Sequence, residues 1–158
     1  MNSTIQLRDI KLNDLAIFYE QQLDPEANYM AAFTAKDPED RAAFLAHWAK
    51  IFGDKSIILR TIMADQMVAG HVSCHRWFGE PEISYWIGKD YWGRGIATEA
   101  LSEFLEQVPA RPLLARVAKD NMGSIRVLEK CGFKRTGEDK GFANARGREV
   151  EEFIYMLE

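Results

Sequence analysis

Residues 82–101 read EISYWIGKDYWGRGIATEAL and place a strand, a glycine turn and a helix in one short stretch. Alternating polar and apolar side chains in EISYWIG predict the strand, and ATEAL begins a segment with helical spacing. Between them lie Gly93 and Gly95, which permit backbone conformations and close approaches that a side chain would prevent. The turn therefore either holds a ligand against its backbone or only redirects the chain.

An anion site is the functional interpretation of this turn. The first amides of a helix lack partners within the helix, and the helix dipole places positive charge at the same end. A phosphate group can lie against Gly93 and Gly95, with the charge of Arg94 nearby. A helix entry with hydrated amides is the structural alternative, and this stretch alone leaves both open.

Two nucleotide-binding signatures with similar glycine turns fit the chain poorly. A Rossmann fingerprint follows the first strand of a βαβ unit and needs an acidic residue about 20 residues further on. Here three predicted strands directly precede the turn, and no acid ends the later strand LLARVA. A P-loop needs Gly-Lys-Ser or Gly-Lys-Thr, which the turn lacks. Binding of NAD or ATP at this turn is thus disfavoured.

The segments around this stretch predict an α+β fold. Apolar spacing predicts, in order, strand 3–8, helices 12–23 and 40–52, strands 56–63, 67–77 and 82–88, helix 97–108, strand 113–118, helix 121–133 and one or two closing strands that include 148–158. Two Asp-Pro steps between the first two helices favour turns and helix starts. Because antiparallel strands follow one another without a repeated βαβ pattern, we expect one domain over residues 1–158 with a mixed, mostly antiparallel sheet flanked by helices.

Composition disfavours several classes of function. The 158 residues carry a formal net charge of −4, without the basic footprint that nucleic-acid binding needs. No apolar run reaches the length of a membrane span, and the first residues lack the apolar core of a signal peptide. We therefore expect a cytoplasmic protein with neither nucleic acid nor membrane as a partner. Two isolated cysteines and three histidines without zinc spacing predict that no metal is bound.

A second motif, DNMGSIRVLEKCGFKRTGE, occupies residues 120–138. Its Asn, Ser, Leu, Lys and Gly-Phe, together with the glycine turn, resemble the GNAT superfamily of acyl-CoA-dependent N-acyltransferases. The most similar branch contains the ribosomal-protein alanine acetyltransferases. The resemblance follows the element order of the whole chain and is strongest from Glu82 to Gly137. It implies a GNAT-like domain with a splayed sheet, and acetyl-CoA as the acyl donor.

The resemblance also implies which residues bind acetyl-CoA. Amides of the turn would bind the pyrophosphate, and the end of strand 82–88 would pair with the pantetheine amides as an added strand does. The side chain of Asn121 would contact the cofactor arm, with a helix N-cap as its alternative role. Basic residues of the second motif would attract the 3′-phosphate, with a hydrated helix face as the alternative. The predicted cofactor-binding residues are Trp86, Ile87, Trp92, Gly93, Arg94, Gly95, Ile96, Ala97, Thr98, Asn121, Arg126 and Lys130.

Glu82 and Ser124 are the catalytic residues that the resemblance implies. Some family members have a glutamate at the position of Glu82 that removes the amine proton; a strand-entry carboxylate in solvent is the alternative. Many relatives carry a tyrosine seven residues after the asparagine to protonate the thiolate, but Leu128 stands there. Ser124, three residues after Asn121, matches a serine proposed for that role in the ribosomal branch; an ordinary first-turn helix residue is its alternative.

The resulting hypothesis is an N-acetyltransferase that transfers the acetyl group directly from the thioester to a primary amine. The acceptor would enter between residues 24–37 and 75–82. Aromatic residues expected to line its pocket are Tyr29, Phe33, Trp77 and Phe78. The nearby acids Asp24, Glu26 and Asp37 favour a cationic acceptor. An N-terminal peptide amine, a polyamine, an amino acid and an aminoglycoside all stay open.

Three further points stay open. The missing tyrosine, and Asp90 where the family usually has Gln or Arg, motivate an alternative in which the domain binds acyl-CoA without turnover. Binding of another nucleotide at the glycine turn is a minor alternative. A homodimer is compatible with the closing strand, which could pair with another subunit.

Overall fold

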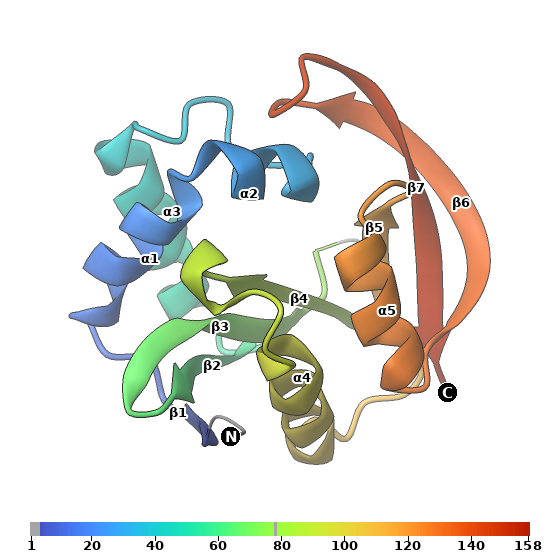
Figure 1. Cartoon of the computed structure of the whole chain (residues 1–158), viewed down its shortest axis with the longest axis horizontal. Coiled ribbons are helices and arrows are strands. Elements are labelled where there is room, and N and C mark those ends of the chain that lie inside the picture. Colours follow the sequence, from blue (N-terminus) through green and yellow to red (C-terminus); the bar gives the residue numbers. More distant parts are fainter. Residues whose placement is uncertain (1–3, 78) are drawn as a thin grey trace.

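The computed structural model describes residues 4–77 and 79–158 (Figure 1). Its strands are β1 (Ile5–Arg8), β2 (Ile58–Ala64), β3 (Met67–His75), β4 (Glu82–Ile87), β5 (Leu113–Ala118), β6 (Lys134–Ala143) and β7 (Arg148–Leu157). Its helices are α1 (Asp14–Gln22), α2 (Pro25–Ala31), α3 (Arg41–Gly53), the short 3₁₀ helix η1 (Lys89–Tyr91), α4 (Ile96–Gln107) and α5 (Met122–Lys130). In the described part of the chain the strands form one seven-stranded sheet in the order β1-β2-β3-β4-β5-β7-β6.

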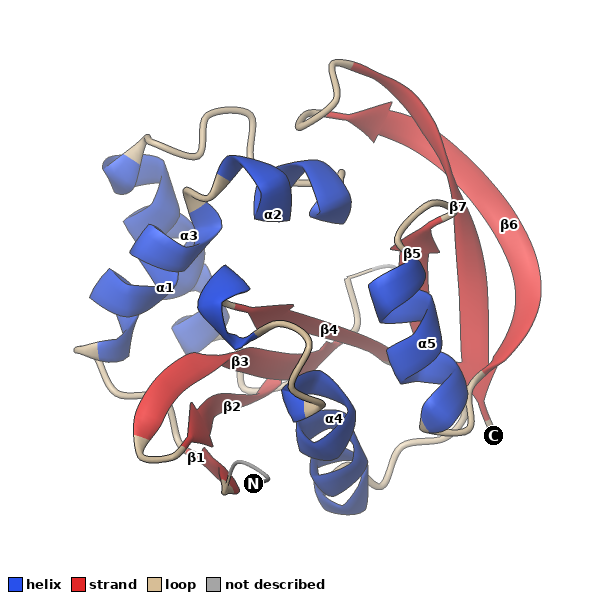
Figure 2. Cartoon of the chain, viewed as in Figure 1, coloured by secondary structure: helices blue, strands red, loops and turns tan. Residues whose placement is uncertain are grey.

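The predicted α+β class is confirmed, and each helix and strand that spacing predicted is present. The structure adds α2, which begins at the first Asp-Pro step. Asp24 caps this helix by accepting a hydrogen bond from the amide of Ala27 at 2.8 Å, and Pro25 occupies its first turn. The chain closes with two strands, because β6 and β7 pair as a long antiparallel hairpin. Figure 2 shows this hairpin curving around one edge of the molecule.

Helices cover the sheet in two groups. α4 and α5 bury side chains such as Leu101, Phe104 and Leu128 in the main apolar core against the strands. α1 and α3 meet β3 through an aromatic cluster, in which Phe18 stacks on Trp48 with ring centroids 5.3 Å apart and both rings contact His71. The two groups of helices fix the sheet from separate sides and leave the end of β4 between them (Figure 1).

The sheet splays between β4 and β5, its one parallel pair among the described residues. The two strands pair in register only at Glu82 and Leu114, next to a hydrogen bond of 2.9 Å from the amide of Leu114 to the carbonyl of Pro81. Beyond this point β5 continues its pairing with β7 alone. The strands diverge toward the carboxyl end of β4, as Figure 2 shows, and the backbone edge of that strand lacks a neighbouring strand there.

Candidate active site

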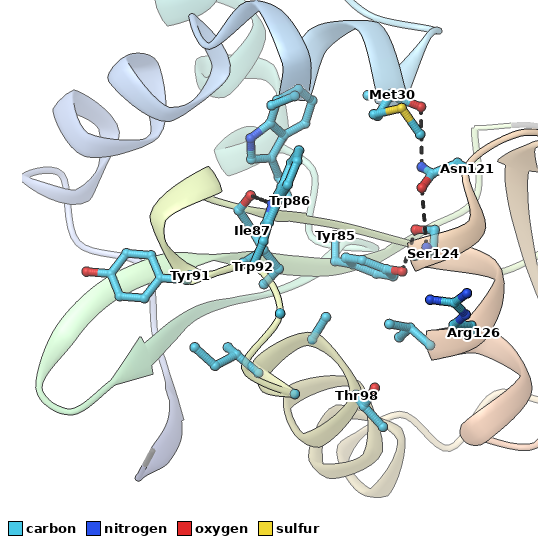
Figure 3. A pocket seen from close by; sticks show the side chains of 18 of the residues that line it. Met30, Tyr85, Trp86, Ile87, Tyr91, Trp92, Thr98, Asn121, Ser124 and Arg126 are labelled. Atoms are coloured by element: carbon cyan, nitrogen blue, oxygen red, sulfur yellow. Dashed lines mark hydrogen bonds between the residues drawn. The ribbon is translucent and has the colours of Figure 1, made fainter. Parts of the chain in front are cut away.

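A cavity of about 580 Å³ lies where β4 and β5 separate. Its walls come from α2, the end of β4, the glycine turn and the first turns of α4 and α5 (Figure 3). The predicted cofactor-binding residues that line it are Trp86, Ile87, Trp92, Gly93, Gly95, Ile96, Ala97, Thr98, Asn121, Arg126 and Lys130. Two motifs that are far apart in the sequence therefore meet at one cavity.

The glycine turn presents backbone amides to this cavity. Gly93 and Gly95 have φ values of 73° and 74°, in the left-handed region that residues with a side chain rarely adopt. The first bond of α4 runs from the amide of Glu99 to the carbonyl of Gly95 at 3.2 Å, and no side chain caps the helix. The amides of residues 96–98 precede that bond and are donors for an anion. A Cβ at either glycine would meet no protein atom within 4 Å, so it would project into the open space at the turn.

Arg94 is the one predicted cofactor-binding residue that does not line the cavity. Its guanidinium lies 3.2 Å from a carboxylate oxygen of Asp65, in the turn between β2 and β3. It also lies over the ring of Tyr91, 5.5 Å from the centroid. In this structure Arg94 joins the glycine turn to the neighbouring hairpin.

The pairing of β4 with β3 determines which residues of β4 direct their backbone groups toward the gap. The amide of Gly88 donates to the carbonyl of Ala69 at 2.8 Å. Backbone groups of alternate residues point to opposite edges of a strand, so Trp86 also directs its backbone toward β3. Tyr85 and Ile87 then direct theirs toward the gap, whereas sequence reasoning had chosen Trp86 and Ile87. The carbonyl of Ile87 accepts a hydrogen bond of 2.9 Å from the Trp92 indole and keeps a second lone pair.

A pair of hydroxyl groups bridges the gap between β4 and α5. The phenol of Tyr85 and the hydroxyl of Ser124 are 2.6 Å apart, and both residues line the cavity (Figure 3). Burial raises the pKa of Tyr85 to about 12, although the hydrogen bond with Ser124 acts in the other direction. The Tyr85 phenol therefore keeps its proton at neutral pH and can donate it.

Tyr85 is the functional candidate that sequence reasoning missed. Tyr85 lies on the same face of β4 as Ile83 and Ile87, and this pattern is typical of a strand face that packs in the core. The family spacing from Asn121 places the acid on α5 at the position of Leu128, which is buried in the core. A tyrosine among aliphatic residues on the inward face of a strand was the available signal, because a buried phenol needs a partner.

Asn121 acts as a helix cap in this structure. Its side-chain oxygen accepts a hydrogen bond from the amide of Ser124, and its side-chain nitrogen donates to the carbonyl of Met30, both at 3.3 Å. These bonds join α2 to the start of α5 across the cavity (Figure 3). The side-chain amide of Asn121 thereby helps to fix the position of Ser124 opposite Tyr85.

Glu82 is buried at the start of β4 and lines neither this cavity nor the one described next. Its carboxylate lies 3.3 Å from Arg116, which also contacts Glu152 at 3.2 Å and Asp139 at 3.1 Å. Burial raises the pKa of Glu82 above its ordinary value, although the charge of Arg116 acts against the shift. The structure thus gives Glu82 an ion-pair partner, and its role as a base stays a prediction.

A second cavity of about 490 Å³ lies between the loop after α2, α1, α3 and the strands β3 and β4. Phe33 and Trp77, which were predicted to line an acceptor pocket, line this cavity together with Asp37, which was predicted to lie near that pocket. Tyr29 does not: its ring packs under the guanidinium of Arg146, 4.3 Å away. Phe78 lies outside the described residues.

The two cavities share Trp86, which lines both of them. Of the three acids predicted to lie near an acceptor pocket, only Asp37 lines the second cavity. Glu26 lines the first cavity and pairs with Lys89 at 2.7 Å, while Asp24 caps α2. Trp86 therefore lies beside both cavities, and a ligand in either one would contact it.

Two general properties bear on the class of site. Among the described residues, no three His, Cys, Asp or Glu side chains are grouped so that they could hold a metal ion. None of the helices in residues 4–77 and 79–158 is long and apolar enough to span a bilayer.

Residues 4–134 match the family described as Acetyltransferase (GNAT) domain. The chain belongs to this family, whose enzymes use acetyl-CoA as the acetyl donor, and the expected family and N-acetyltransferase class are confirmed.

Relatives in sequence carry matching names. The chain is 27% identical to the Uncharacterized N-acetyltransferase YnaD of Bacillus subtilis (strain 168) over 96% of this chain and 91% of that protein. A match to the Uncharacterized N-acetyltransferase p20 of Bacillus licheniformis is 28% identical and covers 50% of this chain and 47% of that protein.

Solved structures share the fold. Mycobacterium smegmatis RimJ in complex with CoA-disulfide superposes with a TM-score of 0.78 at 22% identity, covering 97% of this chain and 81% of that one. A spermidine N-acetyltransferase from Vibrio cholerae in complex with CoA and spermine gives 0.76 at 18% identity, covering 96% and 95%. At these identities the likeness concerns the fold alone.

Proposed function

We propose that the chain transfers an acetyl group directly from acetyl-CoA to a primary amine. The observation that carries the proposal is that Trp86 lines two cavities, one beside the splayed strand and glycine turn and one among aromatic side chains. Direct transfer needs two substrate sites that join at the reacting atoms, because holding both reactants in position supplies much of the rate.

The first cavity has donors suited to acetyl-CoA, which supplies an activated thioester when bound. The amides of residues 96–98 would receive the pyrophosphate, and the free backbone edge at Tyr85 and Ile87 would pair with the pantetheine amides. Arg126 and Lys130 lie one turn apart on α5 and line the same cavity, where their charges would attract the 3′-phosphate.

The reaction requires two proton movements that this chain can serve. The ammonium first loses its surplus proton, which ends in solvent. The amine nitrogen then forms the amide bond as the carbon–sulfur bond breaks, the sulfur takes a proton from a donor of this chain, and the proton that leaves the amide nitrogen restores that donor. The Tyr85 phenol, held by Ser124, is the proposed donor to the sulfur. Glu82 is the proposed acceptor of the amine proton, through water. Unchanged turnover in Glu82→Gln would contradict the role of Glu82 as proton acceptor and leave the other assignments standing.

Thermal unfolding with acetyl-CoA tests the donor site, with NAD and ATP as controls. A ligand that binds only the folded state at 100 times its Kd adds about 2.7 kcal/mol of stability. We expect acetyl-CoA to raise the Tm and the two controls to leave it nearly unchanged. No shift at saturating acetyl-CoA, or a larger shift with NAD or ATP, would contradict the assignment of the first cavity.

A release assay for free CoA separates transfer from binding alone. Transfer predicts thiol release that depends on an added amine, whereas a domain that only binds acyl-CoA would give a Tm shift and no amine-dependent release.

A further inference from the structure

The walls of the second cavity are dominated by aromatic rings. The rings that line it belong to Phe18, Phe33, Phe44, Trp48, Trp77 and Trp86. Trp77 is held in place by the imidazole of His75, with the two rings stacked at 3.9 Å. Rings of this kind bury flat apolar groups, and their faces attract cations. The volume of about 490 Å³ is within the range of small-molecule sites.

The two carboxylates that line this cavity give its lining a negative charge. Asp37 and Asp40 line it, and the described lining residues include no Lys or Arg. His47 and His71 also line it, but burial lowers the pKa of both imidazoles, for His71 to about 4. Both are therefore neutral at pH 7. The cavity thus favours a cationic ligand and offers an anionic group no basic partner.

Among the residues that line the cavity, two buried side-chain atoms lack hydrogen-bond partners in the described part of the chain. They are the indole nitrogen of Trp86 and the hydroxyl oxygen of Thr34. Such atoms are costly to leave unpaired, so they point to a ligand with a small polar group. Trp86 also lines the first cavity, so one of the two atoms belongs to a residue that lies beside both cavities.

We propose that the acceptor is a primary amine on an aromatic body that carries no carboxylate or phosphate. This inference rests on the proposed function and names the substrate class of the same site. The ring system of the acceptor lies among the aromatic walls, Asp37 and Asp40 attract its ammonium on entry, and the amine reaches the thioester beside Trp86. A free amino acid would bring a carboxylate into a negatively charged cavity. A polyamine or an aminoglycoside has no ring system to pack among the aromatic side chains and would place several charges or hydroxyl groups against them.

The test compares acceptors that differ in one feature. Phenethylamine, phenylalaninamide and phenylalanine share a ring and an amine, and only the last has a carboxylate. Spermidine, kanamycin and a tripeptide with N-terminal alanine represent the other classes. The readout is kcat/KM from amine-dependent CoA release, with hydrolysis of acetyl-CoA subtracted. We expect phenethylamine and phenylalaninamide to exceed phenylalanine by at least about tenfold, a ratio that corresponds to 1.4 kcal/mol.

Two variants link the preference to the cavity. Trp77→Ala should lower kcat/KM for phenethylamine about tenfold and leave the KM for acetyl-CoA unchanged, and Trp77→Phe should restore part of the loss. Phe142→Ala is the matched control, because Phe142 is an exposed ring on β6 that lines neither cavity. Asp37→Asn should narrow the ratio between phenethylamine and phenylalanine, whereas Asp9→Asn, at an exposed carboxylate outside both cavities, should not.

The outcomes separate this inference from the proposed function. Higher kcat/KM for spermidine, kanamycin or the peptide than for phenethylamine would overturn the aromatic acceptor and leave the transferase intact. Acetylation of none of the amines would overturn the transferase. A binding readout then still decides the ligand class: phenethylamine must raise the Tm of the CoA-bound protein more than phenylalanine does, and an equal effect would overturn the inference.

Discussion

Tyr85 and Ser124 face each other across the gap between β4 and α5, and their hydroxyl groups are 2.6 Å apart. Neither residue could have been paired with the other from the sequence, because 38 positions separate them and the strand pattern around Tyr85 reads as core. The position of Ser124 was predicted, whereas its partner depends on how the sheet splays. Burial raises the pKa of Tyr85 to about 12, so the phenol is protonated at pH 7. A phenol is still more acidic than the aliphatic hydroxyl of Ser124, which makes Tyr85 the stronger candidate for the proton donor of the pair.

Tyr85→Phe removes that proton and little else. We expect kcat to fall about 100-fold, at the lower end of what general acid catalysis contributes, with the KM for acetyl-CoA within about twofold of the wild type. Steady-state CoA release measures both constants. Ser124→Ala is the comparison, because it leaves the phenol in place, and it should lose less. The reverse order, a large loss in Ser124→Ala and none in Tyr85→Phe, would return the donor role to Ser124.

At the scale of an element, the turn between β4 and α4 shows which features the local sequence predicts and which it does not. Two glycines before a helix predicted exposed amides, and both glycines adopt positive φ at the cavity. The position of the Arg94 side chain could not be predicted in this way, because its partner Asp65 lies in the hairpin of β2 and β3. Likewise, strand alternation located β4, but the direction of the Trp86 backbone follows only from its register with β3.

Gly95→Ala tests the turn against a matched control. A left-handed conformation costs a residue with a side chain about 1–2 kcal/mol, so Gly95→Ala and Gly147→Ala should lose similar stability. Gly147 also has a positive φ and open space at its Cβ position, but it lies in the turn between β6 and β7. Only Gly95→Ala should weaken acetyl-CoA binding, measured by calorimetry. Equal binding by the two variants would contradict the phosphate site at this turn.

Asp14 ties three elements together, since its carboxylate accepts hydrogen bonds from Arg8, the Lys11 amide and Thr61. Burial opposes its ionisation, but these bonds outweigh burial and lower its pKa to about 2.

A pKa of Asp14 that is lower in the folded than in the unfolded state stabilises the fold at pH values above the unfolded pKa near 4, and this contribution disappears as the pH falls through 2. Asp14→Asn should therefore cost about 2 kcal/mol at pH 7 and progressively less toward pH 2. Urea unfolding across this pH range measures the difference, with Asp9→Asn as the control. A cost that does not change with pH would contradict the ion pair as its source.

At the scale of the whole molecule, the order of the elements was predictable and the cavities were not. Apolar spacing located the helices and strands, and the two motifs indicated which ones meet. The second cavity forms because α1, α3 and the loop after α2 pack over β3 and β4, which no local pattern encodes. Phe33 and Trp77 were predicted to line it from their position in segments unlike the family, while Trp48 and His71 were visible only as core or strand residues.

Formation of an acetylated amine is the measurement that tests the central claim most directly. The protein is incubated with acetyl-CoA and phenethylamine, and the N-acetyl product is quantified by mass spectrometry beside the CoA released. The account predicts one acetylated amine for each CoA, at a rate that Tyr85→Phe lowers. Release of CoA without an acetylated amine, or no release with any amine despite a Tm shift with acetyl-CoA, would contradict it.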